Sequence, residues 1–242
     1  MDYAIEVKEL TKKFGSLIAV NGISFSIEKG KIFGFLGPNG SGKSTAIRMI
    51  CGVLSPTSGT VSVFGHEISK YGFRHNIGYM SQKFSLYEDL TVEENLDFYG
   101  GIYSLPKNVI NERKAELIQM ANLTGKEKSL AGTLSGGWKQ RLALGCAMIH
   151  KPRLLILDEP TAGVDPVSRR LFWQIIRNLS KQGITTLVST HYMDEAESCD
   201  VVGFILYGDL LEFDAPAEMI KKYKANNLED VFFCLISSAT QL

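Results

Sequence analysis

The sequence has no long hydrophobic run and no excess of charge of either sign. A membrane-spanning helix needs about 18–20 apolar residues in a row, and the longest apolar runs here, around 201–206 and 231–236, are far shorter. The 26 basic and 26 acidic residues cancel, so no basic field supports nucleic-acid binding. We therefore expect a globular protein that is not itself a membrane channel and has no nucleic-acid partner.

Cysteines are few and scattered. Cys51, Cys146, Cys199 and Cys234 lie far apart and none belongs to a C-x-x-C pair, so the sequence supports neither a zinc site nor a redox site. We expect all four to be reduced packing residues of a cytosolic protein. The first six residues also lack the basic and apolar regions of a secretory signal.

Alternating strand and helix patterns predict an α/β fold. Short strands are predicted at 5–8, 23–27, 60–64, 154–157 and 185–189, and the continuous apolar run 32–36 predicts a parallel strand buried on both faces. A helix is predicted at 44–51, and another at 166–182 connects two parallel strands. From about Leu90 to His150 the pattern is helical, with a capping box at Thr91–Glu94 and breaks at Pro106, Gly125 and Gly132.

A glycine-rich segment follows the buried strand and opens the first helix. It matches G-x-x-x-x-G-K-[ST] at every fixed position, through Gly37, Pro38, Asn39, Gly40, Ser41, Gly42, Lys43 and Ser44. Such a loop points backbone N–H groups at phosphate oxygens. We expect Lys43 to bridge the β- and γ-phosphates, Ser44 to bind Mg²⁺ and Thr45 to lie near the α-phosphate. The alternative is a glycine-rich turn that happens to contain Lys-Ser.

An acidic pair follows the strand predicted at 154–157. Asp158 and Glu159 would lie at the carboxyl end of that strand, where ligands bind in open α/β sheets. Asp158 is the expected Mg²⁺ ligand, and Glu159 is the expected general base that polarises the attacking water. Taken alone, the pair could simply begin a turn before Pro160.

A second possible anion site opens a helix inside the insertion. Ser135, Gly136 and Gly137 precede Trp138 and a helical pattern to Met148, and a helix N-terminus beside a hydroxyl attracts phosphate. Two phosphate sites in one chain suggest two copies placed head to tail, with each γ-phosphate held between one copy's loop and the other copy's Ser135. A plain helix cap at Ser135 is the alternative.

These segments, taken in order, resemble the ATP-binding cassette (ABC) family over nearly the whole chain. The ordered set is Gly37–Ser44, the glutamine of Tyr79–Gln82, Leu134–Arg141, Leu154–Glu159, Ala162–Asp165 and Ser189–His191. The resemblance implies ATP as substrate, with Gln82 sensing Mg²⁺ and the attacking water. It also implies that Asp165 communicates across the dimer and that His191 contacts the γ-phosphate.

The resemblance also implies a fold and a domain plan. The expected fold is a P-loop NTPase (RecA-like) core with an N-terminal antiparallel β subdomain and an inserted α-helical subdomain. One domain, 1–242, would divide into a core at 1–89 and 151–215, a helical subdomain at 90–150 and a C-terminal tail at 216–242.

Two positions depart from the family pattern. Trp138 stands where a glutamine is usual, and an indole cannot replace the hydrogen bonds of an amide. Phe14 stands where the adenine-stacking residue is usually tyrosine, but stacking needs only the ring. Phe14 could alternatively fill the core.

Transport by such a chain would need a transmembrane partner. We expect a permease subunit to dock near Gln82–Asn95, which would hold the chain on the inner face of the cell membrane; aromatic packing between subdomains is the alternative role for Phe84, Leu86 and Tyr87. The Ala162–Pro166 form and the segment 227–232 resemble the group that serves drug, lipid and polysaccharide exporters. ABC proteins of translation or DNA repair are the alternative class, and a kinase or GTPase is disfavoured by Leu134–Arg141 and His191.

Overall fold

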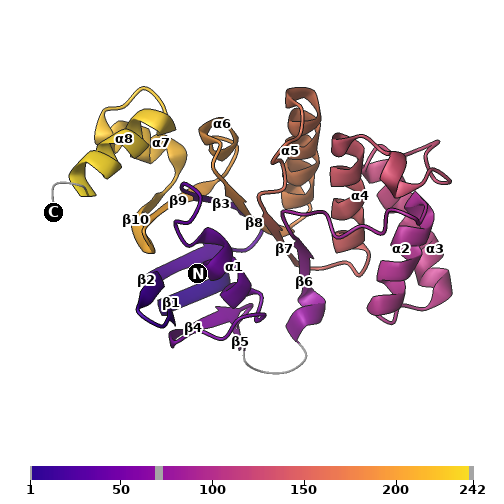
Figure 1. The fold of residues 1–242 in the computed structure, drawn as a ribbon, viewed down its shortest axis with the longest axis horizontal. Coiled ribbons are helices and arrows are strands. Elements are labelled where there is room, and N and C mark those ends of the chain that lie inside the picture. Colours follow the sequence, from indigo (N-terminus) through magenta and orange to yellow (C-terminus); the bar gives the residue numbers. More distant parts are fainter. Residues whose placement is uncertain (1, 69–72, 240–242) are drawn as a thin grey trace.

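Two β-sheets and eight α-helices form the part of the chain that this computed structural model describes, residues 2–68 and 73–239 (Figure 1). The strands are β1 (Tyr3–Phe14), β2 (Leu17–Glu28), β3 (Ile32–Leu36), β4 (Ser58–Val63), β5 (His66–Glu67), β6 (Ile77–Met80), β7 (Leu154–Asp158), β8 (Thr185–Thr190), β9 (Val201–Leu206) and β10 (Asp209–Asp214). The helices are α1 (Lys43–Ile50), α2 (Val92–Ile102), α3 (Lys107–Met120), α4 (Gly136–Met148), α5 (Pro166–Lys181), α6 (Met193–Ala196), α7 (Pro216–Tyr223) and α8 (Leu228–Ala239), with 3₁₀ helices at Phe73–Asn76 and Ala131–Thr133. None of the described helices has the length and apolar character needed to cross a bilayer.

The six-stranded sheet holds the predicted buried strands. Its order is β10-β9-β3-β8-β7-β6, and every neighbouring pair is parallel except β9 and β10. Every residue of β3, β7 and β8 is buried, because helices cover one face of this sheet, and α1 with the smaller sheet covers the other. The carboxyl ends of β3, β7 and β8 therefore meet at one edge, with Asp158 opposite Ser189.

The second sheet is antiparallel, in the order β2-β1-β4-β5. Its first two strands have 12 residues each and so extend well beyond the predicted runs 5–8 and 23–27. Register shifts along the pair interrupt the alternation of apolar and polar residues, which is why only fragments were predicted. Strand β4 begins at Ser58, two residues before the predicted strand 60–64, and ends at Val63.

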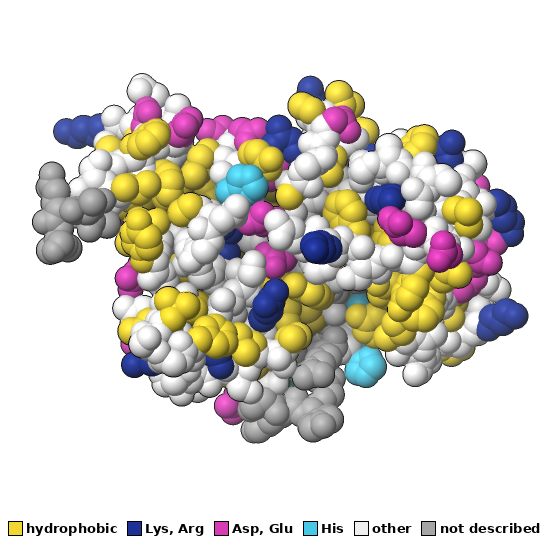
Figure 2. All heavy atoms as spheres, viewed as in Figure 1, with side chains coloured by type: hydrophobic (Ala, Val, Ile, Leu, Met, Phe, Trp, Pro, Cys, Tyr) yellow, Lys and Arg dark blue, Asp and Glu magenta, His cyan; other side chains and the backbone are white. Residues whose placement is uncertain are grey.

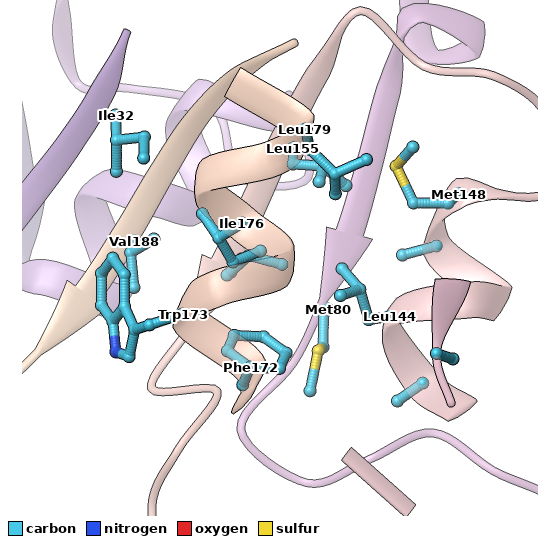
Figure 3. Packing of buried hydrophobic residues seen from close by; sticks show 14 of the residues in the cluster. Ile32, Met80, Leu144, Met148, Leu155, Phe172, Trp173, Ile176, Leu179 and Val188 are labelled. Carbon is cyan, nitrogen blue, oxygen red and sulfur yellow. The ribbon is translucent and has the colours of Figure 1, made fainter. Parts of the chain in front are cut away.

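The main hydrophobic core lies between the six-stranded sheet and its helices. Helix α5 buries Phe172, Trp173, Ile176 and Leu179 on one face, and Figure 3 shows them beside Leu155 and Val188 of the sheet, with Met80 and Leu144 packed further along. A second core lies between the other face of that sheet, α1 and the antiparallel sheet. The sheet carrying the acidic pair is thus packed on both faces.

The helical insertion follows its predicted start. The Thr91 hydroxyl accepts from the Glu94 N–H, and the Glu94 carboxylate accepts from the Thr91 N–H, which completes the capping box. Pro106 is the N-cap of α3, Gly125 lies in a turn after that helix, and Gly132 lies in the 3₁₀ helix that separates α3 from α4. The α/β class with an antiparallel sheet and inserted helices is confirmed.

The predicted C-terminal tail is helical where the structure describes it, and the expectation for one cysteine there needs correction. Residues 216–239 form α7 and α8 and contribute Met219, Leu228 and Val231 to the main core; the last three residues of the predicted tail lie outside the described ones. Cys234 is exposed on α8, so only the other three cysteines are buried packing residues.

Candidate functional site

The glycine-rich loop turns sharply between β3 and α1. Gly42 has φ 109° at the helix N-cap, a conformation that L-residues with a Cβ rarely adopt. A Cβ on Gly37 would lie 2.2 Å from the Ile205 carbonyl oxygen, and one on Gly42 would lie 2.4 Å from the Ala19 carbonyl oxygen. The loop therefore needs glycine at both positions to pack against neighbouring backbone.

Lys43 is the buried cation of this loop. Its side chain is 3% exposed, and Nζ donates to the carbonyl oxygens of Gly37 (2.6 Å) and Pro38 (3.0 Å). Burial lowers its pKa, and the charges of Glu159 and Asp158 oppose that effect. Because Nζ is also 3.6 Å from Glu159 Oε1, Lys43 connects the loop to the acidic pair.

Asp158 lies opposite Ser44, the residue that directly follows Lys43. Ser44 Oγ donates to Asp158 Oδ1 at 3.1 Å, and Ser189 Oγ donates to the same oxygen at 2.6 Å. Hydroxyl and carboxylate oxygens are the ligands that Mg²⁺ prefers, and it usually keeps several waters beside one or two protein ligands. The oxygens of Ser44 and Asp158 therefore fit a Mg²⁺ ion chemically.

Glu159 lies between three predicted site residues, Lys43, Gln82 and His191. Gln82 Nε2 donates to Glu159 Oε2 at 3.1 Å, while His191 Nδ1 lies 3.4 Å from that oxygen without hydrogen-bond geometry. The Glu159 backbone has φ 47°, which is strained for a glutamate. The Glu159 N–H is held by Ser189, through both its hydroxyl (2.9 Å) and its carbonyl (3.2 Å).

Most of these predicted residues line one cavity of about 530 Å³. Its lining includes Phe14, Asn39, Gly40, Gly42, Lys43, Ser44, Thr45, Gln82 and Glu159. The volume lies in the range of about 300–1,000 Å³ for small-molecule sites. Phe14 is 49% exposed, so it does not fill the core and its ring is accessible from the cavity.

The second predicted anion site lies elsewhere. Ser135, Gly136 and Gly137 do not line the cavity, and α4 is separated from α1 by the intervening sheet strands (Figure 1). Ser135 is the exposed N-cap of α4 and its side chain makes no capping hydrogen bond. Trp138 is half-buried, with Lys126 Nζ 4.6 Å from its ring centroid. Within one chain the structure therefore does not bring the two sites together.

The N-termini of α4 and α5 pack closely. A Cβ on Gly137 would lie 2.2 Å from Ser168 Oγ, so glycine is needed there as well. Asp165 caps α5 by accepting from the Ser168 N–H at 2.9 Å, which lowers the pKa of this exposed carboxyl. Asp165 thus lies beside the exposed end of α4 rather than in the cavity.

The apolar residues after Gln82 lie in two different environments. Phe84 and Leu86 pack against the main core, whereas Tyr87 is 48% exposed with its ring centroid 4.3 Å from that of Phe98. Phe98 and Ile102 of α2 are 38% and 58% exposed, and Figure 2 shows hydrophobic side chains gathered over this helix. We call Tyr87, Phe98 and Ile102 the α2 patch.

Sequence reasoning missed two contributors to this site. Ser189 was part of a quoted motif but was given no role, although it contacts both Asp158 and Glu159. Its signal was its position at the end of a strand predicted beside the Asp158 strand. Tyr207 lines the cavity from the β9–β10 turn, and nothing near it in the sequence indicated that.

Known proteins share both the sequence and the fold. The family model described as "ABC transporter" matches residues 20–162. A probable multidrug ABC transporter ATP-binding protein of Escherichia coli, YbhF, is 45% identical over 240 residues, which are 96% of this chain and 41% of that protein. The linearmycin resistance ATP-binding protein LnrL of Bacillus subtilis is 39% identical over 90% of this chain and 71% of its own length.

A solved structure adds information on nucleotide state. The dimeric ATP-binding cassette in a post-hydrolysis state, bound to ADP and Pi, has a TM-score of 0.78 and 26% identity, covering 87% of this chain and 98% of its own. The family match extends over more than half of the chain. This chain therefore belongs to the ABC transporter family.

Proposed function

We propose that this chain binds ATP with Mg²⁺ and hydrolyses it to drive a membrane exporter. The observation that carries the proposal is the single cavity in which an exposed aromatic ring, a glycine-rich loop, Lys43 and Glu159 meet. The ring of Phe14 suits adenine stacking. The loop and Lys43 suit a triphosphate, since both present N–H donors at a helix N-terminus.

The residues divide the chemistry among them. Lys43 exchanges its carbonyl partners for the β- and γ-phosphate oxygens, and Ser44 and Asp158 would hold Mg²⁺, with Gln82 as a further ligand. When bound, Mg²⁺ neutralises phosphate charge. The Glu159 carboxylate accepts a proton from water as the water oxygen attacks the γ-phosphorus, and the bond to the β-phosphate oxygen breaks. His191, 3.4 Å from Glu159, contacts the γ-phosphate.

Two copies complete each site. Because Ser135 is exposed and outside its own chain's cavity, a second copy placed head to tail delivers Ser135, Gly136 and Gly137 to the γ-phosphate in trans. Hydrolysis removes the phosphate that bridges the copies, and the dimer opens because ADP lacks that contact. The relative that is dimeric with ADP and Pi bound supports a dimer.

The transport role rests on the relatives and on the α2 patch. The chain spans 41% of the length of YbhF, so the activity of a whole transporter is inferred. Relatives named for multidrug transport and antibiotic resistance favour export over a role in translation or DNA repair. The α2 patch, which takes Tyr87 from the predicted docking segment Gln82–Asn95 and continues along α2, suits a transmembrane permease that would hold the chain at the inner face of the membrane.

The test is Glu159→Gln, which removes the proton acceptor while keeping the size of the side chain. We expect ATP binding to persist, turnover to fall at least about 100-fold, and a dimer to accumulate with MgATP but not with MgADP. Steady-state phosphate release and analytical ultracentrifugation measure the two effects.

Two further variants distinguish a loss of dimerisation from a loss of ATP binding. Ser135→Arg in the Glu159→Gln background should abolish the dimer and leave ATP binding by the monomer intact, whereas Lys43→Ala should abolish binding. Near-normal turnover of Glu159→Gln would remove Glu159 from the role of base. A Ser135→Arg variant that still dimerises with MgATP would refute the head-to-tail arrangement.

A further inference from the structure

A buried carboxylate lies outside the nucleotide cavity, on the short helix α6. Glu195 is 4% exposed and does not line that cavity. Its Oε2 accepts hydrogen bonds from Thr161 Oγ1 (2.9 Å) and Thr190 Oγ1 (2.8 Å). A buried carboxylate is costly to stability even when it is hydrogen-bonded, so its presence calls for a reason other than packing.

The two threonines flank the residues that perform the proposed chemistry. Thr161 lies two residues after Glu159, and Thr190 immediately precedes His191. Both are buried. Thr190 Oγ1 also accepts from the Tyr192 N–H at 3.0 Å, which fixes the orientation of its hydroxyl. A single carboxylate oxygen thus joins the turn after β7 to the last residue of β8.

The other oxygen of this carboxylate is less strongly held. Glu195 Oε1 makes no hydrogen bond among the described residues, and Arg169 Nη1 lies 3.7 Å away, with its guanidinium 4.6 Å from the ring centroid of Tyr192. Burial raises the pKa of Glu195, while the two threonine hydroxyls and Arg169 oppose that effect. The two threonine hydrogen bonds are therefore its principal specific contacts.

We propose that Glu195 is a positioning residue for ATP hydrolysis, which holds the turns carrying Glu159 and His191 at a fixed separation. The inference rests on the proposed function. A shift of about 1 Å in a reacting group can cost about 100-fold in rate, and Glu159 and His191, which directly follow β7 and β8, lie 3.4 Å apart. The phosphate loop belongs to β3 and α1 and does not depend on this contact, so nucleotide affinity should not change.

The experiment compares Glu195→Ala and Glu195→Gln with the control Glu197→Gln, an exposed carboxylate two residues away. We expect Glu195→Ala to lower kcat about 10- to 100-fold, with Kd for ATP within about twofold of wild type. Glu195→Gln should be intermediate, because its amide oxygen can still accept both hydroxyls. Glu197→Gln should match wild type.

A second pair of variants covers the case in which Glu195→Ala does not fold. Thr161→Val and Thr190→Val remove one hydroxyl each and keep the branched shape. Each should lower kcat. Where Glu195→Ala folds, combining it with either threonine variant should lower kcat by less than the product of the single effects, since both changes break the same contact. Folded variants that bind ATP and keep the wild-type kcat would overturn the proposal.

Hydrogen–deuterium exchange separates this inference from the proposed function. The Glu195→Ala variant, or Thr190→Val if Glu195→Ala does not fold, should exchange faster at residues 159–162 and 190–192 and at the wild-type rate in 43–50. If wild type did not hydrolyse ATP but this exchange pattern were found, the proposed function would fail and the contact between the turns would stand. Unchanged exchange in both turns would refute the contact itself.

Discussion

Among single residues, Ser189 shows how one hydroxyl can organise a site. It donates to Asp158 at 2.6 Å and accepts from the Glu159 N–H at 2.9 Å. The first contact orients the proposed Mg²⁺ ligand, and the second holds the strained backbone of the proposed base. Ser189 is fully buried, so no water can replace its hydroxyl without rearrangement.

We expect Ser189→Ala to lower the free energy of unfolding by about 1–3 kcal/mol, because it leaves a buried carboxylate and N–H with fewer partners. The ATPase rate should also fall, since Glu159 loses a constraint. Urea unfolding and phosphate release measure both quantities.

Thr186→Val is the matched control for that change. Thr186 is buried on the same strand, and its hydroxyl has no hydrogen-bond partner among the described residues. Its removal should therefore be neutral or stabilising. A Ser189→Ala variant no less stable than Thr186→Val would contradict the assigned contacts.

At the scale of helices and strands, local signals were predicted well and distant contacts were not. The capping box at Thr91–Glu94 could be predicted because both partners lie within four residues. The contacts of Glu195 and Ser189 could not be predicted, because each joins residues of different elements. Likewise, the apolar positions of α8 were visible in the sequence, but their place in the main core depends on tertiary packing.

The end of α4 provides a pH-dependent contact between elements. His150 stacks on Tyr103, with ring centroids 3.6 Å apart, and its Nε2 lies 3.0 Å from the Ile77 carbonyl oxygen of β6. Burial lowers the pKa of His150 to about 4, with His75 and Arg113 adding smaller effects of the same sign. The ring is therefore neutral in the folded protein at pH 7.

Between pH 6.5 and 4 the unfolded chain binds a proton at His150 and the folded chain does not, so stability should fall as the pH falls. We expect His150→Gln to remove about 1–2 kcal/mol of that decrease, a value reduced for the partly exposed ring. Urea unfolding of both proteins at pH 7 and pH 4.5 measures the difference. Equal decreases in both would show that His150 is not the titrating group.

For the whole molecule, the α2 patch and α8 lie at opposite ends (Figure 1). We expect Tyr87→Asp with Phe98→Asp to reduce recovery of a polytopic membrane partner at least about tenfold, because charge is placed in the docking surface, while ATP binding persists. Affinity purification of the tagged chain from its native cells after mild detergent extraction is the measurement.

Phe233→Asp is the control for the docking prediction, since Phe233 is 60% exposed on α8. It should leave recovery of the partner unchanged. If the double variant still recovers the partner, docking lies elsewhere on the surface. If the unaltered chain recovers no membrane protein, the export role fails and the ATPase proposal stands.

The left-handed backbone of Glu159 has an evolutionary consequence. At φ 47° a glutamate costs about 1 kcal/mol or more relative to glycine, which adopts this conformation freely. Random mutation followed by selection for stability alone would move this position toward glycine or asparagine. Replacing Glu159 by glycine or asparagine should therefore make this turn more stable while removing the carboxylate that the proposed chemistry needs.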